Sequence, residues 1–155
     1  MNVRVAKLTA KWWRKKIECN QHDNGDPSDE CQMAGILADL LAARNKPSPI
    51  QLDRFEEVLA EVIAHFEESD TIDLRCDYYP CALLHNVAVA AGIDDSVFPW
   101  KTSTYTTKDK VEVSDGYGAP LVEIDDSYFQ EEDISSVYGT MENGGESLRQ
   151  NNTEE

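Results

Sequence analysis

Cys81 and His85 have the residue types and the spacing of a metal-ligand pair or of a nucleophile and its base. They are four residues apart, and neighbours at that spacing lie on one face of a helix. Cys76 lies five residues before Cys81 and could contribute to the same metal site. Alternatively, Cys81 follows Pro80 in the first turn of a predicted helix, a position that favours a thiolate nucleophile, and His85 would be its base.

Both arrangements lack partners in the sequence. Structural zinc sites usually show two close ligand pairs, whereas here the remaining ligands would be Cys19 or His22, three residues apart and next to a predicted loop. A catalytic Cys–His pair also needs an oxyanion site and an orienting group, and the sequence marks neither. We therefore expect reduced, buried cysteines, no cofactor, no metal and no enzymatic activity. A small metal- or cysteine-dependent domain that uses Cys76, Cys81 and His85 is the alternative.

A row of carboxylates is the stronger chemical signal. Residues three and four apart on a helix lie about 5 to 6 Å from each other. One predicted helix has acids at this spacing opposite Phe55, Val62 and Phe66, with Arg54 as the only nearby cation. The row and its continuation beyond the helix form the predicted partner-binding site: Asp53, Glu56, Glu57, Glu61, Glu67 and Glu68.

This row has two interpretations. It can be an ordinary solvated face, since a few like-charge pairs cost little. It can also imitate the phosphates of a duplex, which carries one charge per about 1.7 Å of its axis, and so occupy the Lys/Arg groove of a nucleic-acid-binding protein. Further acids could extend the same negative surface: Asp115, Glu123, Asp125, Asp126 and the run 131–133.

Charge is divided unevenly along the chain. Residues 1–16 carry six Lys/Arg and no acid, although the whole chain has a formal net charge of −16. The acidic body repels nucleic acid and anionic membranes and attracts basic partners. The basic segment, which includes Trp12 and Trp13, could contact a membrane surface, contact nucleic acid or pack on the acidic body, and we favour packing.

The pattern of apolar residues predicts an α+β fold with three to four helices packed on a small antiparallel C-terminal sheet. Helices are expected over residues 3–17, 26–44 and 48–66. The second has an apolar stripe of Ala34, Leu37, Leu40 and Leu41, and the third begins with a capping box formed by Ser48 and Gln51. A helix from Pro80 to Gly92 is apolar nearly all round, so it is expected to be central and buried. Strands are expected over residues 71–77, 104–107, 111–113 and 121–124, with bends at Gly116 and Gly118.

These elements predict three regions. Residues 1–18 form a basic N-terminal arm or helix, residues 19–126 a single globular domain, and residues 127–155 an acidic, largely disordered tail. The longest uncharged run, residues 78–93, is too short to span a bilayer. No apolar core and cleavage site of a signal peptide follow the basic segment, so we expect a cytoplasmic protein.

Three short segments follow one another in the second half of the chain: residues 91–93 (AGI), 98–102 (FPWKT) and 116–120 (GYGAP). Together they resemble a pattern of small uncharacterised proteins of bacteriophages and prophages, over roughly residues 70 to 125. That resemblance implies a phage source and the cytoplasm of a host cell, and it transfers no functional residue. Small acidic phage proteins are often inhibitors of host machinery, including restriction and CRISPR effectors.

We therefore expect a phage-encoded acidic protein that binds and inhibits a basic, nucleic-acid-handling host protein or nucleoprotein complex by charge mimicry, in the manner of an anti-restriction or anti-CRISPR protein. We expect no direct nucleic-acid binding through the acidic body and no membrane span. A structural or accessory phage protein whose basic arm docks a partner is a further alternative. The sequence leaves the oligomeric state open.

Overall fold

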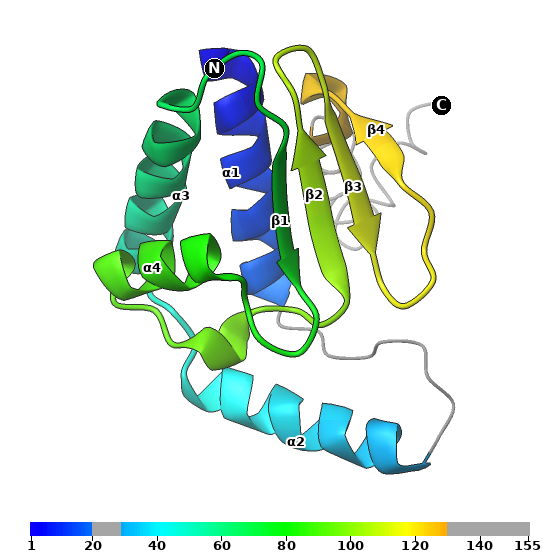
Figure 1. The fold of residues 1–155 in the computed structure, drawn as a ribbon. Helices are drawn as coiled ribbons and strands as arrows, with labels where there is room; N and C mark the ends of the chain where they lie inside the picture. Colours follow the sequence, from blue (N-terminus) through cyan, green and yellow to red (C-terminus); the bar gives the residue numbers. More distant parts are fainter. Residues whose placement is uncertain (20–28, 130–155) are drawn as a thin grey trace, which may run out of the picture. The chain divides into compact units, whose positions relative to one another are not determined.

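The computed structural model describes residues 1–19 and 29–129, and this part of the chain has the predicted α+β fold. Helices precede a four-stranded antiparallel sheet in the C-terminal half and pack against it (Figure 1). Residue contacts divide the chain into one unit of Met1–Glu123 and a second unit that begins at Ile124. The predicted helix start at Asp26, the candidate ligand His22 and the acidic run 131–133 lie outside the described residues. Of the predicted tail 127–155, only residues 127–129 are described, and they are helical.

Helix α1 (Val3–Cys19) forms the centre of the first unit and lies between α3 (Pro49–Ala64) and the sheet (Figure 1). Trp12 and Trp13 are 0% exposed, with ring centroids 5.4 Å apart in an edge-to-face arrangement. Trp13 also packs edge-on against Phe98, at 6.2 Å. The expectation that the basic segment packs internally is therefore confirmed, and two of its basic side chains form ion pairs with the neighbouring elements: Arg14 with α3 and Lys16 with the sheet.

The sheet consists of β1 (Ile72–Cys76), β2 (Thr102–Thr106), β3 (Val111–Asp115) and β4 (Val122–Ile124), in that order. Buried residues alternate along the first three strands, and Thr104 pairs with Leu74 on one side and with Val113 on the other. The predicted hairpin and the bends after it are confirmed: Gly116 and Gly118 have φ values of 116° and 72°, which favour glycine.

Threonine hydroxyls join α1 to the buried face of the sheet. The Thr9 and Thr106 hydroxyls lie 2.7 Å apart, and the Thr9 hydroxyl donates to the Val5 carbonyl at 2.9 Å. Trp13 Nε1 donates to Thr104 Oγ1 at 3.0 Å. Because these polar groups are fully buried yet hydrogen-bonded, they fix the position of α1 on the sheet without an unsatisfied donor at this contact.

Helix α3 begins with the predicted capping box. Gln51 N donates to Ser48 Oγ at 3.2 Å, and Ser48 N donates to Gln51 Oε1 at 2.9 Å. The buried side chains are Leu52, Phe55, Leu59 and Ile63. The prediction that Val62 and Phe66 complete this stripe is wrong, because spacings of three, four and four residues bring Ile63 onto the core face and leave Val62 and Phe66 partly exposed.

Helix α4 (Ala82–Ala91) begins after Cys81, whereas Pro80 forms a bridge with Cys76 instead of opening the helix. It ends at Gly92, with φ 74°, and Ile93 N donates to the Ala88 carbonyl at 2.8 Å, as the cap sequence predicts. The prediction of a central, buried helix is wrong. Only one side, formed by Leu84, Val87, Ala88 and Ala91, is buried, and α1 occupies the centre.

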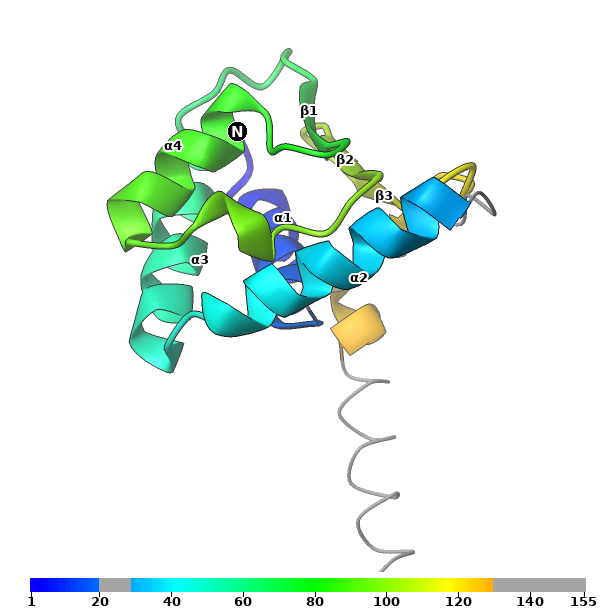
Figure 2. The same ribbon diagram turned by 90° about the horizontal axis from the view of Figure 1, so that it is seen from below.

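Helix α2 (Asp29–Arg44) contacts mainly the short 3-10 helix η1 (Asp95–Val97), at one end of the first unit (Figures 1 and 2). Asn45 Nδ2 donates to Ser96 Oγ at 3.0 Å and joins the two segments. The predicted apolar stripe of α2 is not part of the core, because Leu37, Leu40 and Leu41 are exposed. No helix in the described part of the chain is long and apolar enough to cross a membrane.

Candidate partner-binding surface

The six predicted site residues lie along α3 and in the turn that follows it. Asp53, Glu57 and Glu61 are exposed on α3, and Glu56 is half-buried. Glu67 and Glu68 follow the end of the helix and are also exposed. The predicted surface is therefore accessible, but its two halves have different surroundings.

In the first half, Arg14 of α1 binds two of the acids. Its Nη1 donates to Asp53 Oδ1 at 2.6 Å and to Glu56 Oε1 at 2.9 Å. Partial burial lowers the pKa of Arg14, but the hydrogen-bonded carboxylates of Glu56 and Asp53 raise the pKa by more than burial lowers it. The net shift of the Arg14 pKa is therefore upward. The prediction that Arg54 is the only nearby cation is wrong, because Arg14 also lies beside the row of acids. Arg14 is 39 residues from Asp53 in the chain, so the spacing of residues along one helix could not reveal this contact.

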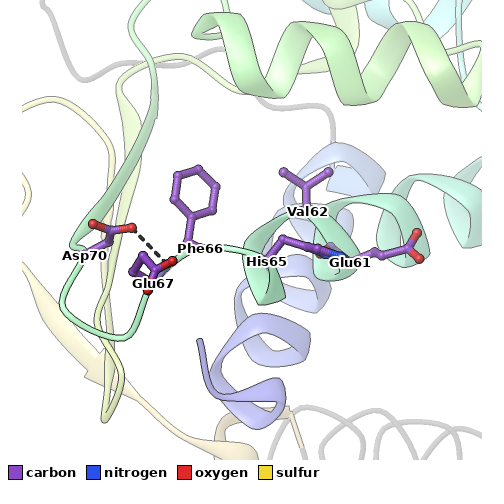
Figure 3. Close-up of a pocket in the computed structure, with 6 residues that line it drawn as sticks. All are labelled: Glu61, Val62, His65, Phe66, Glu67 and Asp70. Carbon is purple, nitrogen blue, oxygen red and sulfur yellow. Dashed lines mark hydrogen bonds between the residues drawn. The ribbon is translucent and has the colours of Figure 1, made fainter.

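The second half of the surface contains a pocket at the C-terminal end of α3. It has a volume of about 570 Å³ and opens widely to solvent. Val62 and Phe66 project to the same side, and the carboxylates of Glu61 and Asp70 lie at opposite ends (Figure 3). The lining consists of two apolar residues, three acids and one histidine: Glu61, Val62, His65, Phe66, Glu67 and Asp70.

Hydrogen bonds within the turn hold this pocket in shape. Glu67 N donates to Asp70 Oδ2 at 2.9 Å, as drawn in Figure 3, and Asp70 N donates to the Glu67 carbonyl at 3.1 Å. The Met1 ammonium donates to the carbonyls of Ala64 and Phe66, at 3.1 and 2.6 Å. Carbonyl groups at the end of α3 are thereby satisfied, and Glu61 and Glu67 keep their carboxylates exposed.

The pocket has the chemistry that accepts a lysine or arginine side chain. Long cationic side chains lay their methylene stems on apolar surface and keep the charged head near acceptors. Val62 and Phe66 supply the apolar part, and Glu61, Glu67 and Asp70 supply the carboxylates. The negative partial charge at the C-terminal end of α3 is already met by the Met1 ammonium, which binds the Ala64 and Phe66 carbonyls, so the carboxylates supply the attraction for a further cation.

Asp70 and His65 are pocket residues that the sequence prediction missed. His65 Nδ1 lies 2.8 Å from the Glu61 carbonyl oxygen. The signal for Asp70 was the polar run 67–70 directly after a predicted helix, which is typical of a turn that folds an acid back on its own backbone.

The cysteine and histidine candidates do not assemble into one site. Cys76 is buried, and burial raises the pKa of its thiol to about 12, which disfavours a metal-binding thiolate. His85 Nδ1 lies 2.8 Å from Asp95 Oδ2, so Asp95 is the orienting group that the sequence did not reveal. Within the described residues, however, no side-chain hydrogen bond joins Cys81 to His85, and no group of three or more His, Cys, Asp or Glu residues could hold a metal ion.

The acids predicted to extend the negative surface differ in their surroundings and do not all belong to the first unit. Asp115 forms an ion pair with Lys16 of α1 at 2.5 Å, so its charge is locally balanced. Glu123 is exposed at the end of the first unit, and Asp125 and Asp126 belong to the second. Among the predicted acids, those of α3 and the turn 67–70 are therefore the ones that lie close together in the first unit.

No protein-family model matches the chain. Comparison with curated proteins and with solved structures likewise finds no match.

Proposed function

We propose that this protein is a non-enzymatic acidic inhibitor that binds a basic surface of another protein through α3 and the turn 67–70. The observation that carries the proposal is the run of exposed carboxylates from Glu57 and Glu61 to Glu67 and Glu68, which ends in the pocket with Asp70. We refer to these five acids, with Val62 and Phe66, as the α3 surface.

The charge of the α3 surface supports electrostatic recognition. Arg14 balances Asp53 and Glu56 near the start of α3, and the five acids of the α3 surface carry more charge than the Met1 ammonium beside them balances. Like charges that are kept at helical spacing cost a few tenths of a kcal/mol per pair. A partner that supplies lysine and arginine removes this repulsion, and the attraction steers the encounter.

The pocket supports an anchored contact in addition to long-range attraction. A single lysine or arginine of the partner would enter between Glu61 and Asp70 with its stem on Phe66. Such anchors contribute a large share of the affinity at many interfaces, whereas charges at the rim contribute mainly to the rate of association.

The partner class in this proposal is a nucleic-acid-handling host protein, such as a restriction or CRISPR effector. Proteins of this class expose lysine and arginine to bind phosphates, and a row of carboxylates can occupy the same groups. The resemblance of residues 70–125 to phage and prophage proteins supports this class, as does the net charge of −16, which disfavours direct binding to nucleic acid. Such a protein would act in the host cytoplasm.

A capture experiment tests the partner class. The full-length protein is immobilised and incubated with nuclease-treated bacterial lysate at low and at high salt, and captured proteins are identified by mass spectrometry. We expect nucleic-acid-binding proteins that elute as the salt concentration rises. Capture that is independent of salt, or capture of proteins without a nucleic-acid-binding surface, would contradict the proposal.

A further inference from the structure

Helix α2 exposes its large apolar side chains, and its buried residues are small. Gly35 and Ala42 are buried on one side of the helix. The opposite side carries five large residues that are about half exposed: Met33 (58%), Ile36 (57%), Leu37 (59%), Leu40 (64%) and Leu41 (47%). Figure 2 shows α2 running along one end of the first unit.

Such a set of exposed apolar side chains is unusual for a helix side that no other described element covers. Single exposed leucines are common on protein surfaces, but contiguous apolar patches larger than a few hundred Å² are rare on monomeric proteins and mark interaction sites. The five side chains recur at intervals of one, three and four residues, which places them on one stripe along the helix. We call this stripe the α2 face.

We propose that the α2 face binds the α2 face of a second copy of this chain, with the two helices antiparallel about a two-fold axis near Leu37. Stripes of this spacing interlock when two helices cross at a small angle. In a two-fold interface each copy contributes the same patch, so an apolar stripe must be its own complement. Leu37 would meet its counterpart at the centre, Leu40 would lie within one turn of the centre beside Ala34 of the second copy, and Met33 would lie near Leu41 of the second copy.

Charges at the two ends of the α2 face favour this partner and this direction. Glu30 and Arg44 are both exposed and lie on the same side of the helix as the stripe. They are 14 residues apart, which is about 21 Å along a helix. Antiparallel pairing brings Glu30 of each copy beside Arg44 of the other, whereas parallel pairing brings like charges together.

The size of the patch also agrees with a second copy. Five large side chains from each of two faces, all about half exposed, together with the flanking polar residues, contribute towards the total of about 1,000 Å² that a stable interface needs. The end charges of the face, one acid and one base, cancel each other. A protein of net charge −16 can therefore associate with itself here, and the α2 face does not select the basic partner that the α3 surface attracts.

Sedimentation equilibrium of the full-length protein over a range of concentrations tests this proposal. We expect a reversible dimer that dissociates on dilution. L37E/L40E should raise the dissociation constant at least about 100-fold, because both residues lie within one turn of the centre of the contact. V89E is the matched control, since Val89 is also exposed (62%) but lies on α4, and it should leave the dimer unchanged. Circular dichroism should show the same helix content for all three proteins.

Charge reversal tests the antiparallel direction. E30K and R44E should each weaken the dimer about threefold to tenfold, and the double variant E30K/R44E should restore it, because the two charges then exchange places. A chain that stays monomeric at about 100 μM would overturn the proposal, since a weaker contact is not a specific interface. A dimer that survives L37E/L40E, or one that the single charge reversals strengthen, would overturn it as well.

Discussion

Arg14 Nη1 of α1 lies 2.6 Å from Asp53 Oδ1 of α3. This contact joins the basic N-terminal segment to the acidic row, which are the two opposite charge features of the sequence. The same guanidinium holds Glu56 at 2.9 Å. The basic segment therefore stabilises the packing of α1 on α3 and restricts the unbalanced acids to the C-terminal part of α3.

Replacing Arg14 should lower the stability of the fold modestly. In R14M, the carboxylates of Asp53 and Glu56 lose their shared cation, and we expect the free energy of unfolding to fall by about 1 kcal/mol, since the site is partly open to solvent. Urea unfolding at low and high salt would measure this, and the loss should shrink at high salt. K7M removes one positive charge from an exposed position of the same helix and is the control. Equal stability of R14M and K7M would contradict the role of the contact.

The two tryptophans of α1 should respond differently to the same substitution. Trp13 Nε1 donates to Thr104 Oγ1, whereas Trp12 Nε1 is buried without a hydrogen-bond partner among the described residues. W13F removes a buried hydrogen bond and leaves the threonine hydroxyl unpaired, which should cost about 1 to 3 kcal/mol more than W12F. Thermal and urea unfolding of both variants would test this difference.

A double-mutant cycle isolates the hydrogen bond from the change in packing. W13F, T104V and W13F/T104V should give a coupling free energy of about 1 kcal/mol. Additive effects would show that the Trp13–Thr104 contact contributes no stability of its own.

The stability of the fold should fall at alkaline pH because of Cys76. Burial raises the pKa of this thiol from 9.0 to about 12, so the folded chain keeps the proton that the unfolded chain loses. The contribution to stability is therefore complete below pH 9.0 and is lost as the pH rises towards 12. Unfolding of the native protein and of C76A should be compared across this range, and C76A should show the weaker dependence on pH.

Thiol labelling checks the same burial directly. Iodoacetamide should modify the exposed Cys19 in the folded protein and Cys76 only after denaturation. Labelling of Cys76 at the rate of Cys19 under native conditions would contradict its burial.

Local signals predicted most of the secondary structure. The capping box at Ser48, the cap at Gly92 and the hairpin 102–115 depend on residues close in sequence, and each lies where it was expected. The errors concern which side of a helix is buried. Helix α4 is apolar nearly all round, and α2 is apolar on its outer side, so periodicity alone could not show that α1 forms the centre.

The candidate site was predictable only in part. Helical spacing found the acids of α3, but it could not reveal that Arg14 balances Asp53 and Glu56, because that contact spans 39 residues. The pocket depends on Val62 and Phe66 being outside the core, and this follows from the packing of Ile63 rather than from the pattern of α3 itself.

The most direct test of the proposed function is the affinity of charge-reversed variants for the partner identified by capture. E61K/E67K changes two acids of the pocket, and D109K/E123K changes two exposed acids elsewhere by the same total charge. Calorimetric titration at low salt should show at least about a tenfold loss of affinity for E61K/E67K and little change for D109K/E123K, with all three proteins equally folded. Equal losses in both variants, or no loss in either, would contradict binding through the α3 surface.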